Sequence, residues 1–192
     1  MENAKYEFTG QTKTWFGKTL HQIRAVASFG FVVKGEVGGW IEAEANLSVA
    51  GDAWVAGDAR VAGNARVAGN AWVAGDAWVA GDARVEGNAR VAGNARVAGN
   101  ARVAGNARVE GNADFFLLGP IGSRRDYLCI YSDERIGIRV ATGCFAGSVE
   151  EFLSSVDNTH GDNGHGEAYR KAIELALMMV KTAQVEKQAE AA

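Results

Sequence analysis

The sequence predicts a mainly β chain in which a coil of short parallel strands, a parallel β-helix, lies between an N-terminal β cap and a C-terminal α+β domain. Three observations support this class. A six-residue pattern, V-A-G-(N/D)-A-(R/W), repeats without insertion from Val49 to Val109. Each repeat, called a hexad below, holds one short Ala-X-Val strand and one Gly-Asn or Gly-Asp corner, which fits neither a hairpin sheet nor a helix. The flanking segments lack the repeat, and the second carries helix signals.

The N-terminal cap is expected over residues 1–36. Residues 5–8, 12–16 and 19–26 have the composition of short strands, and Gly17-Lys18 is a hairpin turn signal. Residues 35–42 then lead the chain into the first coil. A cap is needed because an open end of a β-helix exposes unpaired strand edges.

The β-helix is expected over residues 37–114. In a strand such as Ala53-Trp54-Val55, the alanine and valine point to one side and the tryptophan to the other. The hexad resembles the repeat of hexapeptide-repeat left-handed parallel β-helix proteins. In that family three hexads form one triangular turn, so the resemblance implies about four coils with residues eighteen apart stacked. It also extends the register back through Leu47 and Ile41, at the position of Ala53, and forward to Phe115 at the valine position.

Stacking at eighteen places the outward residues in three columns, with about 4.8 Å between successive coils. The columns are Trp54, Trp72, Arg90, Arg108; Arg60, Trp78, Arg96, Asp114; and Arg66, Arg84, Arg102. At the corners, side-chain amides and carboxylates are expected to bond the next coil in ladders, as at Asp52, Asn70, Asn88 and Asn106.

Tryptophans on otherwise alanine-surfaced faces suit a protein contact better than water. The predicted oligomer or partner surface comprises Trp54, Trp72, Trp78, Arg66, Arg84 and Arg102. The arginine column has a second interpretation, a solvated face whose guanidinium groups repel only modestly because salt screens them. The resemblance implies association through flat faces, so a homotrimer is expected.

The C-terminal α+β domain is expected over residues 115–192. Strands are predicted at 115–118, 127–131 and 136–140. A capping box at 148–151 starts a helix that ends near residue 157. A second helix is predicted from about residue 167 to 181 because apolar residues recur there at helical spacing.

Composition favours a protein of a reducing cytosol. The net charge of −3 argues against a general nucleic-acid binder, which would normally be strongly basic. Only two cysteines occur, so no disulfide framework is indicated. No signal-peptide pattern and no long apolar run are found, which disfavours secretion and membrane spanning.

Known enzymes of the hexapeptide β-helix type are disfavoured. As the family is known, its acyltransferases need a histidine near the coil, and its zinc carbonic anhydrases need three. Residues 37–114 contain none, and no loop interrupts the repeat. The sequence therefore predicts a non-enzymatic protein without a cofactor. Metal-ligand residue types gather only at Cys144, His160, Asp162 and His165, which are interpreted as a polar helix connection rather than a metal site.

A small-ligand site is predicted around the segment that follows the repeat. Glycines let a ligand approach backbone N–H groups, serine adds a hydroxyl donor, and arginine binds phosphate through charge-assisted hydrogen bonds. The segment lacks the ending of a P-loop, so nucleotide hydrolysis is not implied. The alternative is a turn carrying two solvated arginines. The predicted ligand-binding residues are Gly122, Ser123, Arg124, Arg125, Tyr127, Arg139, Thr142 and Cys144.

The whole layout resembles proteins encoded by bacteriophages and prophages. The resemblance rests on a Tyr-Glu-Phe-Thr-Gly opening, Gly38-Gly39-Trp40-Ile41-Glu42, a variable number of repeats, and Thr159-His160-Gly161-Asp162-Asn163. It implies a setting but transfers no catalytic residue. The leading hypothesis is a non-enzymatic oligomer that sequesters an anionic small molecule, such as a cyclic nucleotide signal of host anti-phage defence. The alternative is a scaffold or host-protein-binding oligomer, and a hexapeptide-family acyltransferase comes third.

Overall fold

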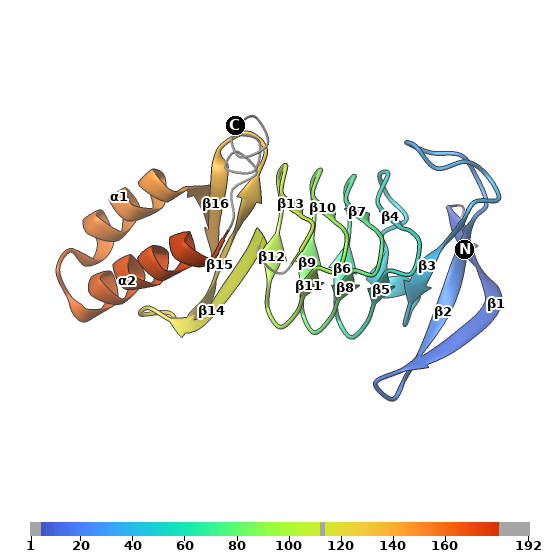
Figure 1. Ribbon diagram of the computed structural model, residues 1–192, viewed down its shortest axis with the longest axis horizontal. Helices are drawn as coiled ribbons and strands as arrows, with labels where there is room; N and C mark the ends of the chain where they lie inside the picture. The colour runs from blue at the N-terminus through green and yellow to red at the C-terminus, as the bar shows by residue number, and fades with distance from the viewer. Residues whose placement is uncertain (1–4, 112–113, 181–192) are drawn as a thin grey trace, which may run out of the picture. The chain divides into compact units, whose positions relative to one another are not determined.

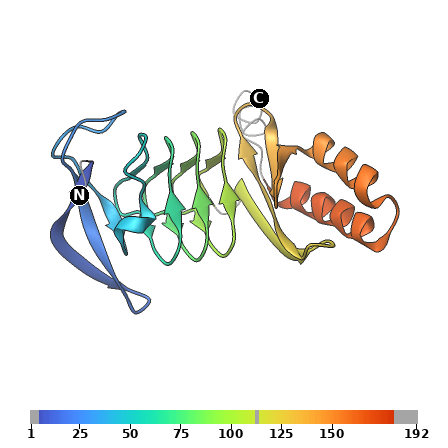
Figure 2. The same cartoon turned by 180° about the vertical axis from the view of Figure 1, so that it is seen from behind.

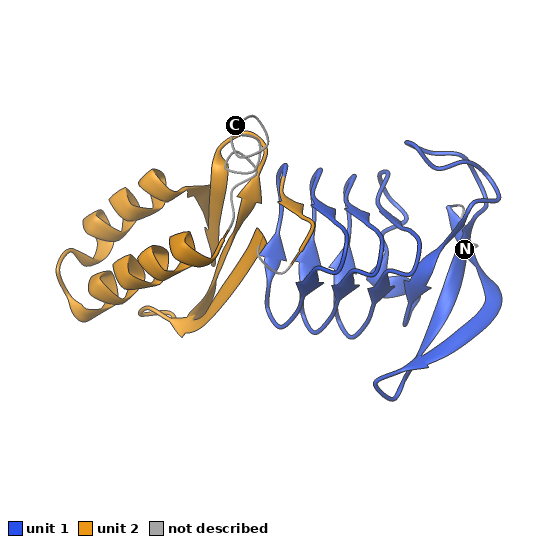
Figure 3. Cartoon of the chain, in the orientation of Figure 1, with its two compact units in different colours: residues 1–106 blue, residues 107–192 orange. Residues whose placement is uncertain are grey.

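The structure is a computed structural model that describes residues 5–111 and 114–180. The chain divides into two compact units, residues 1–106 and residues 107–192 (Figure 3). The first holds the N-terminal cap and the solenoid, and the second holds one short strand, an antiparallel sheet and two helices (Figures 1 and 2). The predicted fold class is confirmed. Among the described residues there is no helix with the length and apolarity required to cross a membrane.

The solenoid of the first unit consists of short strands paired in parallel on three faces. One face carries β3, β5, β8 and β11, the second β4, β7 and β10, and the third β6, β9 and β12. Their bounds are β3 (Val37–Ile41), β4 (Trp54–Val55), β5 (Arg60–Val61), β6 (Arg66–Val67), β7 (Trp72–Val73), β8 (Trp78–Val79), β9 (Arg84–Val85), β10 (Arg90–Val91), β11 (Arg96–Val97) and β12 (Arg102–Val103). From β4 onward, partners lie eighteen residues apart, as in Trp54 with Trp72. The stacking predicted from the hexad is confirmed.

The hexad folds this way because its small and β-branched residues fill the interior. Ala65 and Val67 are both fully buried, and the same holds for the other copies of this pair from Ala53 to Val103. At the corners the chain turns through glycines in the left-handed region, such as Gly69 with φ of 69°. A Cβ at Gly69 would also lie 3.0 Å from the backbone nitrogen of Gly87 in the next coil, so glycine is required there for two reasons.

Amide ladders run along the corners. The side chain of Asn70 donates to that of Asn88 at 3.2 Å, and Asn88 donates to Asn106 at 3.3 Å. The backbone N–H of Asp52 donates to the Asn70 oxygen at 3.4 Å, which extends the ladder to the first coil. The predicted ladder is confirmed, and it is structural because each step joins one coil to the next.

The first coil differs from the prediction. Ile41 pairs with Val61 and Leu47 with Val67, which are twenty residues apart rather than eighteen. Both side chains therefore occupy the valine position, not the position of Ala53. The chain between Leu47 and Asp52 contains two extra residues, and Val49, where the repeat begins in the sequence, is 59% exposed. A 3-10 helix, η1 (Glu44–Asn46), lies just before this enlarged corner.

The N-terminal cap is an antiparallel hairpin that continues one solenoid face. β1 (Tyr6–Trp15) pairs with β2 (Lys18–Ala25), and β2 pairs antiparallel with β3. A bulge between Phe8 and Thr12 joins the two predicted strands into one bent strand. The turn is Phe16-Gly17, one residue earlier than predicted, with φ of 46° and 74°. Such paired positive φ values match the twist of a two-residue hairpin turn.

Trp54 is buried, which corrects its placement on an exposed partner surface. Its side chain is fully inaccessible. The ring of Phe29, from the loop after β2, packs edge-on against it with centroids 5.5 Å apart. A Cβ at Gly38, in β3, would lie 2.7 Å from the Trp54 ring, so the first solenoid strand also packs closely against this tryptophan. Sequence alone does not reveal which outward positions a cap covers.

The second unit is a four-stranded antiparallel sheet in the order β14, β15, β16, β17, with two helices packed on it (Figures 1 and 2). The strands of the sheet are β14 (Phe115–Ile121), β15 (Asp126–Asp133), β16 (Gly137–Thr142) and β17 (Phe145–Ser148), and the helices are α1 (Val149–His160) and α2 (Gly164–Met179). A separate short strand, β13 (Arg108–Val109), precedes them. Phe115 starts β14 opposite Tyr131, so it does not continue the solenoid register as predicted.

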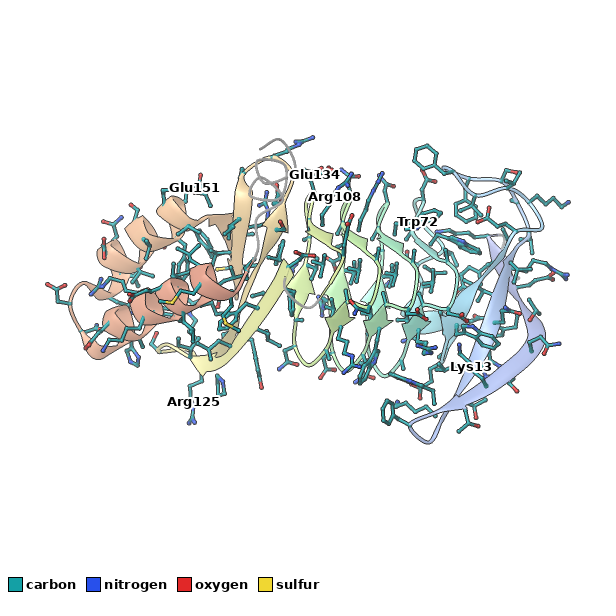
Figure 4. All side chains as sticks on the ribbon, in the orientation of Figure 1. Lys13, Trp72, Arg108, Arg125, Glu134 and Glu151 are labelled. Carbon is teal, nitrogen blue, oxygen red and sulfur yellow. The ribbon has the colours of Figure 1, made fainter. Side chains whose placement is uncertain are left out.

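The helices begin where polar side chains cap them. At the start of α1, Ser148 and Glu151 form the predicted capping box, with bonds of 3.2 and 2.8 Å (Figure 4 labels Glu151). Asn163 caps α2 by accepting from the N–H groups of His165 and Gly166. The core beneath the helices is formed by Leu128, Ile130, Val140, Phe152, Val156, Tyr169, Ala172, Ile173, Ala176 and Val180.

Candidate functional site

A cavity of about 280 Å³ lies in the second unit, where two turns meet the helices. The β14–β15 turn and the β16–β17 turn lie at the same end of the sheet because each strand pairs antiparallel with the next. The turns form one wall and the helices the other. The lining residues are Ser123, Arg124, Asp126, Thr142, Gly143, Cys144, Phe145, Phe152, Ser155, Val156, Thr159, His160 and Tyr169.

The polar wall contains one arginine and one aspartate. Arg124 is exposed, and its Nη1 atom lies 4.0 Å from the sulfur of Cys144 across the two turns. Asp126 starts β15, and one of its carboxylate oxygens would lie 3.1 Å from a Cβ placed on Gly143. The two formal charges oppose each other, so the wall suits a ligand that carries an anionic group and also hydrogen-bond donors.

The opposite wall is aromatic. The ring of Phe152, from α1, packs between Phe145 and Tyr169 with centroids 5.3 and 5.4 Å away. Tyr169, from α2, reaches the first turn, where a Cβ on Gly122 would lie 2.0 Å from its hydroxyl oxygen. Burial raises the pKa of Tyr169, with a further increase from Asp126 and a partial offset from Arg124. The hydroxyl is therefore a neutral group at neutral pH.

The structure brings together half of the predicted ligand residues. Ser123, Arg124, Thr142 and Cys144 line the cavity, and Gly122 lies against Tyr169. Arg125 and Tyr127 are not among the lining residues. Arg125 takes a φ of 52°, and Figure 4 shows its side chain directed away from the body of the unit.

Arg139 was predicted in the site, but its side chain is bound elsewhere. Its Nε atom lies 2.8 Å from the carboxylate of Asp133, which is fully buried. This pair lies toward the far end of the β15–β16 hairpin, away from Thr142. Burial alone would raise the pKa of Asp133, but the guanidinium of Arg139 and the N–H groups of Arg135 and Ile136 lower it overall. Arg139 therefore has a structural role.

Sequence reasoning missed the helical wall. Phe152, Ser155 and Tyr169 reach the turns only through tertiary packing, and nothing in their local sequence indicates it. Asp126 could have been found, because it directly follows the two arginines of the predicted turn.

The residues with metal-ligand side chains do not converge. The rings of His160 and His165 lie 5.8 Å apart, while Asp162 accepts from Arg170 at 3.3 Å. Within residues 5–111 and 114–180, no group of three or more such side chains could hold a metal ion. In the same residues no hydrogen bond joins Cys144 to His160, although both line the cavity. The two are not arranged as a nucleophile with its base.

The predicted surface of the solenoid divides into covered and open parts. Trp78 packs under Trp15 and Phe16 of the hairpin, at 4.4 and 5.6 Å between ring centroids. Trp72 is only half-buried, and Figure 4 labels it on the β7 strand. The third column is exposed as predicted and consists of Arg66, Arg84 and Arg102. Within it, Glu86 lies 3.7 Å from Arg102, which offsets part of the repulsion.

Comparison with models of known protein families found no match, and comparison with curated proteins found none either.

Proposed function

We propose that this protein binds a small anionic molecule of mononucleotide size in the cavity of its second unit and does not transform it. The proposal rests on one observation: Ser123 and Arg124 line the same cavity, of about 280 Å³, as the aromatic side chains of Phe152 and Tyr169. The aromatic rings offer a base a stacking partner, and Arg124 offers a phosphate a bidentate partner. Typical ligand pockets measure about 300–1,000 Å³, so this cavity lies just below the lower end of that range and would hold no more than one nucleotide unit.

Asp126 refines the proposed ligand. A carboxylate beside Arg124 disfavours several phosphates in the cavity and offers an acceptor to an exocyclic amino group. The ligand class is therefore a nucleotide with one phosphate in the cavity, including one unit of a cyclic oligonucleotide. The resemblance to phage-encoded proteins supports a role in the bacterial cytosol, where the protein would sequester a nucleotide signal of anti-phage defence.

Calorimetry with nucleoside monophosphates and cyclic di- and trinucleotides tests the proposal. Arg124→Ala should weaken binding at least about tenfold, since it removes a charge-assisted contact. The matched control is Arg125→Ala, which removes a neighbouring arginine that does not line the cavity, and it should bind normally. Absence of heat with every nucleotide, or equal losses in the two variants, would overturn the proposal. Mass analysis of recovered nucleotide should show no turnover.

A second candidate function, a scaffold or host-protein-binding oligomer, is favoured by Trp72. Its half-buried indole lies beside the exposed Arg90 on the face formed by β4, β7 and β10, and tryptophan and arginine are both enriched in protein contacts. The homotrimer implied by the hexapeptide resemblance would use such a face. Light scattering on the wild type and on Trp72→Ala tests this function. A fall from trimer to monomer mass in the variant supports the scaffold. A monomeric wild type, or a variant that stays trimeric and keeps its host partners, contradicts a role for Trp72.

A further inference from the structure

The tip of the β1–β2 hairpin folds over the face formed by β3, β5 and β8. Lys13, which is labelled in Figure 4, holds the tip in place. Its ammonium lies 4.1 Å from the ring centroid of Trp40 and 3.8 Å from the carboxylate of Asp58. Trp15 meets Trp78 edge-on, at 88° between the rings, and Phe16 stacks on Trp78 at 22°. The tip is thus an ordered aromatic cluster seated on the solenoid.

Phe16 is both exposed and in a conformation that a large side chain rarely adopts. Its side chain is 78% exposed, and its φ is 46°. Asparagine or glycine would serve this turn position at lower cost. Stacking on Trp78 accounts for one face of the Phe16 ring. The other face is open to solvent, and neither the turn nor burial requires an apolar ring there, so a contact made by the open face would explain it.

Beside this ring lies a groove of about 250 Å³. Trp15, Phe16 and Trp78 line its apolar side. The other side carries Lys18 and two corner residues, Asn64 and Asp82, whose side chains bond each other at 2.9 Å. That bond uses one oxygen of Asp82 and one N–H of Asn64, so the corner keeps further acceptors and a donor for a ligand.

The charges in the groove exclude an anionic occupant. Lys18 donates to both carboxylate oxygens of Glu42, at 2.7 and 2.9 Å, so its charge is neutralised. The hydrogen bonds from Lys18 and from the N–H of Gly63 hold the pKa of Glu42 below its ordinary value, so Glu42 is ionised at neutral pH. Of the charged residues that line the groove, Asp82 is then the one without an ion-pair partner among the described residues, and it repels phosphates and carboxylates.

The rings do not form a cage for a cation. Their centroids lie 4.4 to 5.6 Å apart, so they are in contact with one another and leave no space between them for an ammonium group. Arg96 already lies over the Trp78 ring at 5.9 Å. The cluster offers instead a flat apolar shelf with hydrogen-bonding groups along one edge.

We propose that this groove binds a neutral hexopyranose ring, either as a free sugar or as a unit of a glycan. The apolar C–H face of the sugar would lie on the aromatic ring of Phe16. Asn64 and Asp82 would then bind hydroxyl groups along the edge of the sugar. The volume suits one ring. This site lies in the first unit and is independent of the proposed nucleotide cavity.

Saturation-transfer NMR and calorimetry with neutral monosaccharides, neutral oligosaccharides, a uronic acid and tetramethylammonium test the proposal. Neutral sugars should bind and the uronic acid should not. Preference for oligosaccharides over their monosaccharides would identify a glycan as the source, and equal binding would identify a free sugar. Phe16→Ala should weaken binding at least about tenfold. Phe31→Ala is the matched control, since Phe31 is 89% exposed on the same cap but does not line the groove.

Three results would overturn the proposal: binding of no neutral sugar, binding of tetramethylammonium or the uronic acid in preference to neutral sugars, or equal losses in the two phenylalanine variants. Because Phe16 is mostly exposed, Phe16→Ala is expected to fold, and circular dichroism verifies it. Asp82→Asn is a second probe: it keeps the shape of the corner and should relax the exclusion of the uronic acid.

Discussion

The ion pair between Asp133 and Arg139 stabilises the second unit but lies outside the proposed ligand site. Asp133 is held by Arg139 and by two backbone N–H groups inside the second unit. Removing one partner of a buried ion pair leaves the other uncompensated, which typically costs more than the pair contributes. We therefore expect Arg139→Ala to lower the free energy of unfolding by about 3 kcal/mol, measured by urea denaturation.

Arg139→Ala also tests whether Arg139 lies outside the proposed nucleotide site. At a temperature where Arg139→Ala is folded, its nucleotide affinity should equal that of the wild type, because Arg139 does not line the cavity. The double variant Asp133→Asn, Arg139→Met should recover part of the lost stability by removing both charges. A stable Arg139→Ala protein that fails to bind nucleotide would contradict the structural role.

Glu42 predicts a pH dependence of stability. Its folded-state pKa lies below the ordinary value of 4.5, so its bonds to Lys18 and Gly63 stabilise the fold at neutral pH. The contribution is present above pH 4.5 and is lost as the pH falls through the lower folded-state value. Glu42→Gln should cost about 1 kcal/mol at pH 7, since the pair is partly solvated, and the difference from the wild type should shrink toward pH 3. Urea unfolding at both pH values measures it; a difference independent of pH would contradict the assignment.

At the scale of elements, the cap and the solenoid meet at Trp54. The side chain is fully buried against Phe29 and Gly38, whereas Trp72, one coil later in the same column, is half-buried. Trp54→Ala should lower the free energy of unfolding by about 4 kcal/mol because a large cavity is left. Trp72→Ala should cost only about 1 kcal/mol. Chemical denaturation followed by circular dichroism compares them, and equal losses would contradict the burial of Trp54 by the cap.

Helices and strands were predictable from the sequence where neighbouring residues themselves determine the local structure. The solenoid follows from alanine, valine and glycine at fixed spacing, and the start of α1 follows from the capping box at Ser148 and Glu151. The phase of the first coil was not predictable, because the two residues inserted between Leu47 and Asp52 leave the hexad pattern in the sequence unchanged. β17 was missed because its four residues, Phe145–Ser148, carry little strand signal.

For the candidate site, sequence supplied the turn but not its surroundings. Ser123 and Arg124, which line the cavity, were predicted as ligand residues because glycine, hydroxyl and guanidinium groups occur together in one segment. The aromatic wall depends on how α1 and α2 pack on the sheet, which no local pattern encodes. The same reason explains why Arg139, attractive in composition, was wrongly placed in the site: its partner Asp133 lies six residues earlier across the β15–β16 hairpin.

At the scale of the whole chain, the solenoid separates folding from surface chemistry. The inward alanines and valines are the same in every hexad from 53 to 103, while the outward residue is either tryptophan or arginine without any change of register. Each coil contacts only its neighbours, so the stability of a solenoid is close to a sum over coils. The number of coils should therefore be variable as long as the phase of the repeat is kept.

Two deletions that differ by one residue test this property. Deleting residues 83–100 removes eighteen residues, one full coil, and joins Asp82 to Ala101 in phase. Deleting residues 83–99 joins Asp82 to Asn100 and shifts every later side chain by one position, which turns arginines toward the interior and valines toward solvent. The first variant should keep a cooperative thermal transition at a slightly lower temperature. The second should lose the β-helix of the later coils and aggregate, because arginine cannot be buried there without a partner.

Circular dichroism and light scattering distinguish the two deletion variants. If the in-phase deletion unfolded as well, stability would depend on particular coils; if the out-of-phase deletion folded normally, the inward residues would not determine the register.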